Sequence, residues 1–258
     1  MFDARLIQAS LFKKILESIK DLVESANFDC SPSGISLQAM DSARVTLINL
    51  LLRNDGFDNF SCDRSISLGL SIGALSKVLK CAGNDDTLTL KARDEPDTLT
   101  LVFESPKHDR VSDFEIKLLE LDQDQYGIKD SGYSVTIKMP STELQRICRD
   151  LSALGEVVTI SATKEGVKFS TTGEVGSGNI TVRPTSDTSV PADESTTIDS
   201  KEPVTLNVAL KFLGYFTKAT PLSPIVTIKM SEGAPVVVEY TIEELGYLSF
   251  FLAPKLGD

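Results

Sequence analysis

The 258-residue sequence has no tryptophan, a single histidine and only four cysteines. Cys30, Cys62, Cys81 and Cys148 stand far apart without a Cys-x-x-Cys pair, so their spacing indicates neither a zinc knuckle nor a disulfide framework. His108 lies in a polar stretch, which leaves catalytic and metal-binding arrangements based on histidine short of members. We therefore predict no catalytic residue, no metal and no cofactor.

Long apolar runs are also absent, and no stretch approaches the length of a membrane span. The start, Met1 to Arg5, leads directly into an amphipathic segment without the basic and apolar regions of a signal peptide. Hydrophobic residues make up 41% of the chain, enough for one large or two ordinary domains to bury a core. We expect a globular intracellular protein with no membrane contact.

Positive charge is in deficit. The chain has 26 Lys and Arg against 37 Asp and Glu, which gives a formal net charge of -11. A simple nucleic-acid binder normally has a basic balance, so a role on DNA would require the positive charge to be segregated on one surface.

The hydrophobic periodicity predicts few helices and extensive antiparallel sheet, which is an α+β fold. Segments with the helical period are Leu11–Val23, Ile72–Cys81, Thr142–Leu154 and Leu210–Lys218. Strand-like runs are Ile35–Met40, Val45–Leu52, Thr87–Ala92, Thr98–Phe103, Val111–Leu118, Ser134–Met139, Val157–Thr163, Val167–Thr171, Asn179–Val182, Val204–Val208, Val226–Met230, Val236–Tyr240 and Tyr247–Leu252.

An internal repeat constrains the fold further. Phe12 and Ile15 align with Leu144 and Ile147, and the same offset places Gly34 on Gly166. A second alignment matches Ile66, Leu68, Leu70, Leu75 and Lys80 with Val204, Leu206, Val208, Leu213 and Lys218. We predict two similar domains, each with two helix-plus-strands units.

The predicted domains are residues 1–117 and 135–258. Residues 118–134 lack a sustained period of either kind and belong to neither repeat, so we interpret them as an interdomain connector. A second polar stretch, Thr185–Ser200, is predicted to be a mobile surface loop.

Each predicted helix has two basic residues roughly opposite its apolar stripe. Lys and Arg decorate any exposed helix, so one such face carries no information. All four predicted helices have such a basic face although the chain is acidic, and this favours contacts with phosphates. Phosphate contacts need cationic side chains but no base-reading geometry. The residues are Lys13 and Lys20, Lys77 and Lys80, Arg146 and Arg149, and Lys211 and Lys218.

Repeated helices that share one charged face, joined by continuous sheet, suggest a closed ring lined by helices. With helices about 8 to 10 Å apart, three copies would supply twelve helices and a hole roughly 30 to 40 Å across. A duplex whose two grooves together span roughly 18 Å would pass through it. By the same estimate, a ring of two copies, with eight helices, would have a hole that fits the duplex only tightly.

Motifs along nearly the whole chain are similar to a known family. The most specific is Cys62-Asp63-Arg64 followed by Leu75-Ser76-Lys77-Val78-Leu79-Lys80-Cys81-Ala82-Gly83-Asn84, in a signature region from Ser61 to Lys80. Others are Leu37–Ser42, Ile147–Leu151, Thr217–Leu222 and Leu252–Lys255. Together they resemble the eukaryotic DNA sliding clamps of the proliferating cell nuclear antigen family.

The resemblance implies a non-enzymatic homotrimeric ring in the nucleus that encircles double-stranded DNA without reading its sequence. Antiparallel sheets would lie outside and four helices per chain would line the interior. A clamp loader would place the ring on DNA, where it would act as a DNA polymerase processivity factor. DNA polymerases, a flap endonuclease, DNA ligase and other replication, repair and translesion-synthesis proteins would dock through a short hydrophobic motif.

The basic faces and the resemblance assign residues to surfaces. DNA contacts are expected at Lys13, Lys14, Lys20, Lys77, Lys80, Arg146, Arg149, Lys211 and Lys218. Client contacts are expected at Met40, Arg44, Val45, Leu47, Tyr126, Ile128, Pro235, Phe251, Ala253 and Pro254. Lys164, in the turn Thr163–Gly166, matches the family's lysine for ubiquitin or SUMO attachment.

The trimer is expected to close by strand pairing between Asp109–Lys117 and the Glu174–Arg183 run of a neighbour, because the alternation in the first segment is typical of an edge strand. The interface residues are expected to be Lys77, Cys81, Arg110, Val111, Phe114, Ile116, Cys148, Asp150, Leu151, Val175 and Gly176.

Some positions depart from the family pattern. Ser61 stands where the signature has arginine, and Phe114, Phe212 and Phe251 stand where close relatives often have tyrosine. Two alternatives remain at this point: a subunit of a checkpoint-type heterotrimeric clamp, and an acidic β-rich scaffold that binds only proteins. An enzyme with a metal cluster at Asp41, Asp63 and Asp94 is disfavoured, because acidic loop residues are normally solvated turns.

Overall fold

The computed structural model describes residues 1–122, 126–128, 132–187 and 189–255. They divide into two compact units. The first contains Met1–Ser42, Ile48–Tyr126 and Ile242–Leu248, and the second contains Ala43–Leu47, Gly127–Thr241 and Ser249–Asp258. None of the helices within the described ranges is both long and apolar enough to cross a membrane.

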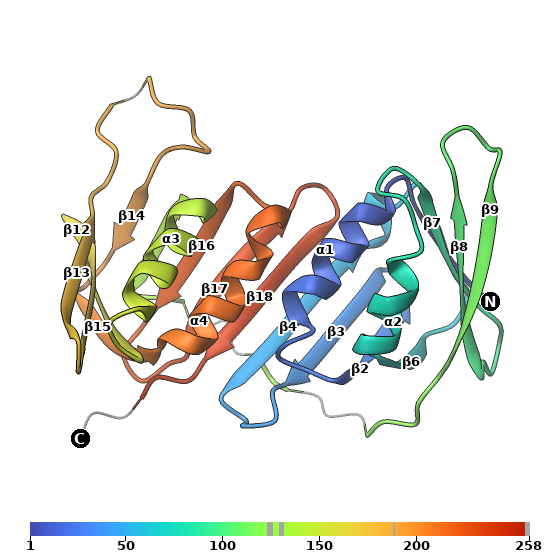
Figure 1. The fold of residues 1–258 in the computed structure, drawn as a ribbon, viewed down its shortest axis with the longest axis horizontal. Helices are drawn as coiled ribbons and strands as arrows, with labels where there is room; N and C mark the ends of the chain where they lie inside the picture. Colours follow the sequence, from blue (N-terminus) through green and yellow to red (C-terminus); the bar gives the residue numbers. More distant parts are fainter. Residues whose placement is uncertain (123–125, 129–131, 188, 256–258) are drawn as a thin grey trace. The chain divides into compact units, whose positions relative to one another are not determined.

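In the first unit, two helices lie on one side of two groups of strands (Figure 1). The strand orders are β5-β1-β7-β8-β9 and β4-β3-β2-β6. The elements are β1 Phe2–Leu6, α1 Ala9–Ile19, β2 Ser25–Ser31, β3 Gly34–Met40, β4 Thr46–Arg53, the 3-10 turn Asn54–Gly56, β5 Asn59–Cys62, β6 Ile66–Ser71, α2 Ile72–Leu79, β7 Thr87–Ala92, β8 Thr98–Glu104 and β9 Val111–Lys117.

The second unit repeats this arrangement with the strand orders β14-β10-β16-β17-β18 and β13-β12-β11-β15. Its elements are β10 Val135–Pro140, α3 Ser141–Ser152, β11 Val157–Thr163, β12 Gly166–Gly173, β13 Gly176–Val182, β14 Thr197–Ser200, β15 Val204–Ala209, α4 Leu210–Phe216, the 3-10 helix Thr217–Leu222, β16 Ile225–Met230, β17 Val236–Ile242 and β18 Gly246–Leu252.

The predicted repeat is confirmed. Both halves of the chain run strand, helix, five strands, helix and three strands, and each strand has the equivalent neighbours in its own half. Strand β4 is therefore the counterpart of β13, and β9 is the counterpart of β18. The fold is α+β with four α-helices and antiparallel sheets in the described part of the chain, as the periodicity predicted.

A close backbone approach explains the repeated glycine. A Cβ on Gly34 would lie 2.0 Å from the carbonyl oxygen of Leu52 in β4, and a Cβ on Gly166 would lie 2.9 Å from that of Val182 in β13. Gly34 also has a φ of 140°, which side chains rarely adopt. The two halves thus share the same tight contact between equivalent strands.

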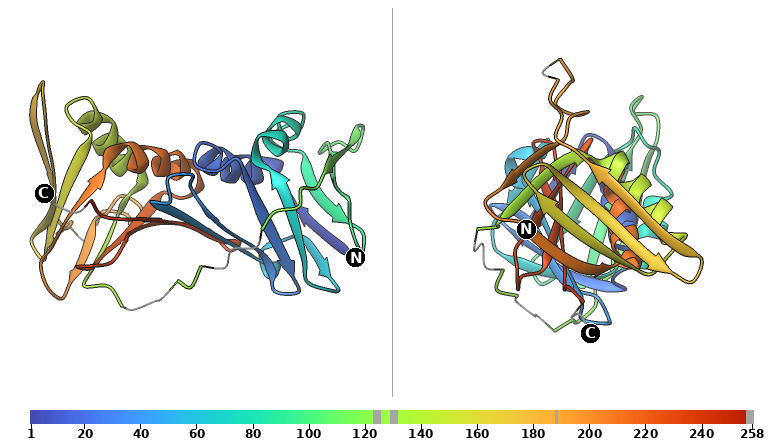
Figure 2. Two further views of the ribbon diagram at one scale, coloured as in Figure 1. Left: turned by 90° about the horizontal axis from the view of Figure 1, so that it is seen from below. Right: turned by 90° about the vertical axis from the view of Figure 1, so that its left-hand side faces the viewer.

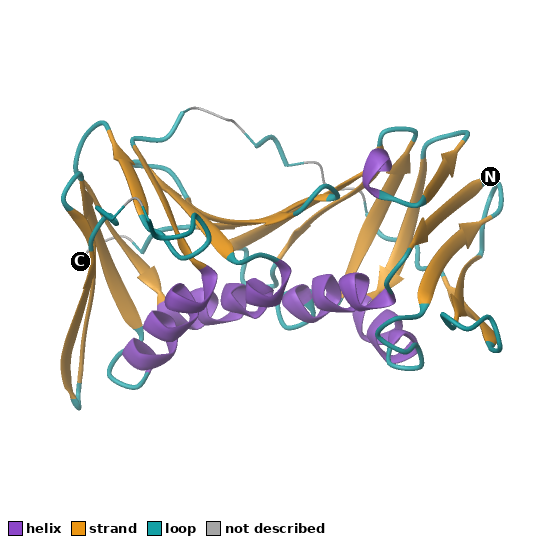
Figure 3. Cartoon of the chain, turned by 90° about the horizontal axis from the view of Figure 1, so that it is seen from above, coloured by secondary structure: helices purple, strands orange, loops and turns teal. Residues whose placement is uncertain are grey.

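Within each unit the helices lie on one side of the strands (left view of Figure 2, and Figure 3). Each helix buries one stripe of side chains. In α1 the buried side chains include Phe12, Ile15 and Ile19, and the ring of Phe12 lies 6.3 Å from that of Phe28 in β2. In the second unit Phe216 stacks on Phe250 with ring centroids 4.5 Å apart. The opposite faces of the helices are left to solvent.

Three sequence expectations need correction. Phe2–Leu6, where no strand was expected, is strand β1, and the helix expected at Leu11–Val23 begins at Ala9 and ends at Ile19. The stretch 185–200, expected to be loop, ends in strand β14, which pairs with β10. Its earlier part is also bonded, because the Thr185 N–H donates to the Thr196 carbonyl at 2.9 Å.

The domain boundaries proposed at residues 117 and 135 stay predictions. The first connector residues are bonded within the first unit: Leu118 N–H donates to Asp97 O at 2.9 Å and Leu119 N–H donates to Gly69 O at 2.8 Å.

Candidate nucleic-acid interface and docking surfaces

The outer faces of α1 and α2 place four predicted DNA-contact residues in solvent: Lys14, Lys20, Lys77 and Lys80. The two helices contact each other, so these side chains belong to one surface of the first unit. Around α2 the charge is uniform, since residues 68–84 contain no Asp or Glu. On α1, Glu17 approaches Lys20 at 2.5 Å and raises the pKa of that ammonium group through this hydrogen bond.

Lys13 differs from the other basic residues of this face. Its Nζ donates to the Ala82 carbonyl at 2.5 Å and lies 3.4 Å from Asn84 Oδ1, and the side chain is half-buried. The same loop is bonded to the start of α1, because Ala9 N–H donates to Asp86 O at 2.7 Å. Lys13 therefore ties the end of the signature region to α1, a role that the helical wheel did not distinguish from phosphate contact.

The helix faces of the second unit carry Arg146, Arg149, Lys211 and Lys218, all exposed. Asp150 is shared by two of them, at 3.6 Å from Arg146 Nε and 3.1 Å from Arg149 Nη2. Residues 203–231, which include α4, contain no Asp or Glu. The Tyr215 ring lies beside both α4 cations, 5.9 Å from Lys211 Nζ and 5.3 Å from Lys218 Nζ. This surface therefore offers cations and an aromatic ring to a ligand.

Two edge strands lie where the trimer contact was predicted. Strand β9 ends the five-stranded sheet of the first unit, and β13 ends the four-stranded sheet of the second. A large exposed hydrophobic residue lies at each edge: Val111, which begins β9, is 62% exposed, and Val175, in the turn just before β13, is 81% exposed. Unsatisfied backbone groups together with exposed apolar side chains are typical of a strand that pairs with another chain.

The other predicted interface residues have different environments. Lys77, Cys81, Arg110, Asp150 and Gly176 are exposed. Phe114 is half-buried, with its ring 5.7 Å from that of Phe103. Ile116, Cys148 and Leu151 are buried within the chain, and burial raises the pKa of the Cys148 thiol to about 12. Ile116, Cys148 and Leu151 would therefore pack beneath the residues that contact a neighbour and would not contact it themselves.

Eight of the predicted client-contact residues belong to the second unit. A backbone bond from Ala253 N–H to Val45 O, 3.0 Å long, holds the C-terminal segment beside the residues that precede β4. Val45, Leu47, Ile128, Phe251 and Pro254 are partly exposed, whereas Arg44, Pro235 and Ala253 are exposed. The remaining two, Met40 and Tyr126, are partly exposed in the first unit.

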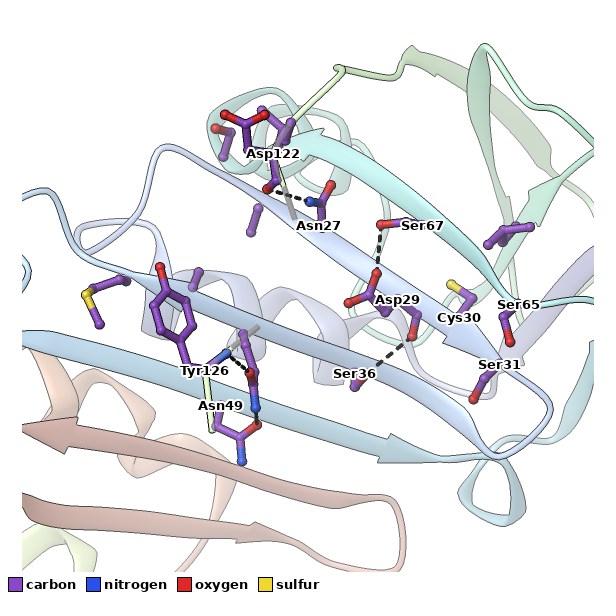
Figure 4. Close-up of a pocket in the computed structure, with 17 residues that line it drawn as sticks. Asn27, Asp29, Cys30, Ser31, Ser36, Asn49, Ser65, Ser67, Asp122 and Tyr126 are labelled. Carbon is purple, nitrogen blue, oxygen red and sulfur yellow. Dashed lines mark hydrogen bonds between the residues drawn. The ribbon is translucent and has the colours of Figure 1, made fainter. Parts of the chain in front are cut away.

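A polar groove of about 750 Å³ in the first unit was missed by sequence reasoning (Figure 4). It lies on the side of β2 and β3 away from the helices and includes Met40 and Tyr126 in its lining. Tyr126 N–H donates to Gln38 Oε1 at 3.2 Å, and Ser67 Oγ donates to Asp29 Oδ1 at 2.7 Å. The alternating polar residues of β2 and β3 were the signal that could have indicated it.

Lys164 is exposed in the turn between β11 and β12. The turn is held by Thr163, whose Oγ1 accepts from Glu165 N–H at 3.2 Å. The lysine is therefore presented on a defined turn.

The residues of the disfavoured metal cluster have other environments. Asp63 and Asp94 lie 3.3 Å and 2.6 Å from the Met1 ammonium nitrogen, and the hydrogen bond to Asp94 raises the pKa of that ammonium group. Asp41 is buried. Among the residues that the structure describes, no three His, Cys, Asp or Glu side chains form a potential metal-binding group.

Comparison with known proteins covers nearly all of the chain. Residues 1–126 match the family description "Proliferating cell nuclear antigen, N-terminal domain", and residues 127–255 match "Proliferating cell nuclear antigen, C-terminal domain". The proliferating cell nuclear antigen of Dictyostelium discoideum is 73% identical over 257 residues, which is 99% of this chain and 100% of that protein. The two domain matches meet inside the predicted connector.

The structural role of Lys13 leads to a prediction about stability. Lys13→Ala should lower the free energy of unfolding by about 1 kcal/mol, because the Ala82 carbonyl loses a charged donor. Lys14→Ala, the adjacent exposed lysine, should change it by less than about 0.5 kcal/mol. Urea unfolding followed by circular dichroism measures both, and equal effects would contradict the distinction between the two lysines.

Proposed function

The chain belongs to the proliferating cell nuclear antigen family, the sliding clamps that serve as DNA polymerase processivity factors, and we propose that it closes as a homotrimer whose basic helix faces surround duplex DNA. It is a clamp in replication and repair, not an enzyme. Membership of the family implies DNA, copies of the chain itself and replication proteins as partners, and we infer that it acts in the nucleus. Full-length similarity to one clamp protein favours this function over a heterotrimeric checkpoint clamp or a protein-only scaffold.

The observation that carries the ring is the pair of unpartnered edges in a repeated fold. Strand β18, the counterpart of β9, has a neighbour at its end, since Ala253 N–H donates to Val45 O. Strand β4, the counterpart of β13, also has one, since Arg53 N–H donates to Leu245 O at 2.7 Å. If β9 of one copy paired with β13 of the next copy, each of these edge strands would gain a backbone neighbour, as their counterparts β18 and β4 already have. Repetition of one such head-to-tail contact closes a ring when the rotation between neighbours adds up to a full turn.

Contact with DNA would be electrostatic and indifferent to sequence. The basic faces of each unit offer Lys and Arg side chains to phosphates, with no arrangement for reading base edges. Retention on DNA would come from encirclement, and the contact energy would only centre the duplex. The net charge of -11 discourages binding of DNA at other surfaces.

Clients would insert a hydrophobic plug at the predicted docking residues. The partly exposed Val45, Leu47, Phe251 and Pro254 give the second unit apolar surface beside the C-terminal segment. The clamp loader, DNA polymerases, flap endonuclease and DNA ligase are the proposed users of this surface. We also propose Lys164 as the site of ubiquitin or SUMO attachment, since it is exposed on a short turn.

The ring proposal predicts that charge on the edges prevents assembly. Val111→Asp with Val175→Asp should leave a chain of 28.0 kDa in light scattering, whereas the wild type should reach three times that mass. An unpaired carboxylate in an interface costs several kcal/mol, so assembly should weaken more than about 100-fold. Ile7→Asp, at another exposed apolar residue, is the control and should assemble normally. A wild-type chain that stays monomeric at micromolar concentration would refute the ring.

The DNA proposal predicts that reversal of the helix-face charges impairs the loaded clamp. K80E/R146E/K211E should reduce DNA-dependent stimulation of a polymerase and the salt dependence of DNA binding, by about 0.9 in slope per lost phosphate contact. K138E/K168E/K201E changes the net charge equally at other exposed lysines and is the control.

Topology is tested with wild-type clamp loaded on DNA at raised salt. It should leave linear DNA with free ends quickly and circular DNA slowly. Equal departure rates would refute encirclement.

The docking proposal predicts a loss of client-peptide affinity. Ile128→Ala removes apolar contact worth about 2 kcal/mol if that side chain is buried by the plug, or roughly 30-fold in affinity. Pro254→Ala should act in the same direction. Val190→Ala, at a half-buried apolar residue in the 185–200 stretch, is the control. Unchanged binding of a hydrophobic docking-motif peptide to the Ile128 and Pro254 variants would show that the plug binds elsewhere.

A further inference from the structure

We propose that Ser105 is a phosphorylation site for a proline-directed kinase, and that its phosphate opens the turn between β8 and β9 and weakens the subunit contact of β9. The first part concerns the chain alone, and the second rests on the ring proposed above. Figure 1 shows this turn projecting from the first unit.

Four Ser or Thr residues of this sequence precede a proline, and of these Ser105 has basic residues after the proline. Lys107, His108 and Arg110 follow it. The other such sites are Ser31, Thr220 and Ser223, and none has Lys, Arg or His among the five residues after its own position. Ser223 is also buried, whereas the residues from 106 to 111 are all exposed. A kinase that selects serine before proline with cationic residues beyond would therefore choose Ser105.

The Ser105 hydroxyl closes the turn. Its Oγ donates to Asp109 Oδ1 at 2.6 Å and accepts from Arg110 N–H at 3.2 Å. Backbone bonds complete the turn, from Ser105 N–H to Arg110 O at 3.0 Å and from His108 N–H to Ser105 O at 2.9 Å. His108 occupies the left-handed region with a φ of 55°, which is costly for a side chain other than glycine. The bonds of Ser105 and the contact between His108 Nδ1 and Glu104 Oε1, 2.7 Å long, together hold this conformation.

The transfer is chemically balanced with ATP as the donor. A bond forms between Ser105 Oγ and the γ-phosphorus as the bond from that phosphorus to the ADP oxygen breaks. The hydroxyl proton passes to the base of the kinase, and ADP leaves. The product carries a charge of about −1.5 to −2 and has lost the donor that held Asp109.

The new charge would lie directly against the Asp109 carboxylate at the start of the edge strand, in a turn that also contains Lys107, His108 and Arg110. Asp109 was within 2.6 Å of the oxygen that is modified, and Glu104 precedes Ser105 in the chain. Repulsion from Asp109 would separate the two sides of the turn, while Arg110 Nε is 3.3 Å from Ser112 Oγ and is oriented along β9. Since Arg110 and Val111 begin the predicted subunit contact, an open turn would present β9 in a poorer geometry to the neighbour.

The first experiment treats the purified chain with ATP and a proline-directed serine kinase that prefers basic residues after the proline, and locates phosphate by peptide mass spectrometry. We expect phosphate at Ser105 and little at Ser31. The modified chain should also show at least tenfold faster amide exchange over residues 105–111. Phosphate at Ser31 instead, or at neither serine, or unchanged exchange after modification of Ser105, would overturn the proposal.

The second experiment measures the assembly of variants by light scattering against concentration. S105E should raise the dissociation constant of the assembly at least tenfold, and S105E/D109N should recover most of that loss because the repelling carboxylate is gone. S189E is the matched control, since Ser189 Oγ also donates to a neighbouring carboxylate, Asp187 Oδ1, at 2.7 Å in an exposed segment outside the edge strands.

The outcomes separate the two proposals. Equal assembly of S105E and S189E, or no recovery by D109N, would overturn the effect on β9 while leaving the ring intact. A wild type that does not assemble at all would refute the ring, and the effect on assembly with it, whereas the exchange measurement would still decide whether the phosphate opens the turn.

Discussion

Burial of one apolar stripe per helix is the constraint on which the charged surface of this protein depends. Phe12, Ile15 and Ile19 fix the orientation of α1 on its sheet, and Leu144, Ile147 and Leu151 do the same for α3. Because each helix buries one face on the sheet, the residues on its opposite face point to solvent. Burial of the apolar face thus places the basic residues on the exposed face. A charge moved to the face that packs on the sheet would unfold the unit before it altered any contact with DNA.

The same periodicity explains how much of the fold could be predicted. Ile72–Leu79, Thr87–Ala92 and Val157–Thr163 were predicted almost to the residue, since their side chains alternate clearly between core and solvent. Strand β14 was missed because it is short, and β2 because its open face is polar; they pair with β10 and β6, whose residues are distant in sequence. Such pairing outweighs local propensity, which is why sequence patterns underestimate short strands.

The site residues divide in the same way. A helical wheel placed the cations on one face but could not separate Lys13 from Lys14, because the difference is the Ala82 carbonyl far along the chain. Alternation identified Val111 as an edge residue, yet it could not reveal that Ile116 belongs to the core. The location of the docking residues came from family resemblance, and the sequence added only the apolar Tyr126 and Ile128 of an otherwise polar connector, since apolar residues on separate segments carry no common period. Contacts between distant segments are the information that a single sequence lacks.

The internal ion pairs bear on how a clamp can bind DNA and still slide. Glu17 pairs with Lys20, and Asp150 is shared by Arg146 and Arg149, so part of the positive charge on these faces is already balanced within the chain. Each balanced cation releases fewer counterions when it meets a phosphate, which lowers both the affinity and its dependence on salt. For a protein held on DNA by adhesion this would be a defect. For a ring held by closure it is an advantage, because weak contacts centre the duplex without fixing the ring at any position, and the time on DNA then depends on how long the ring stays closed.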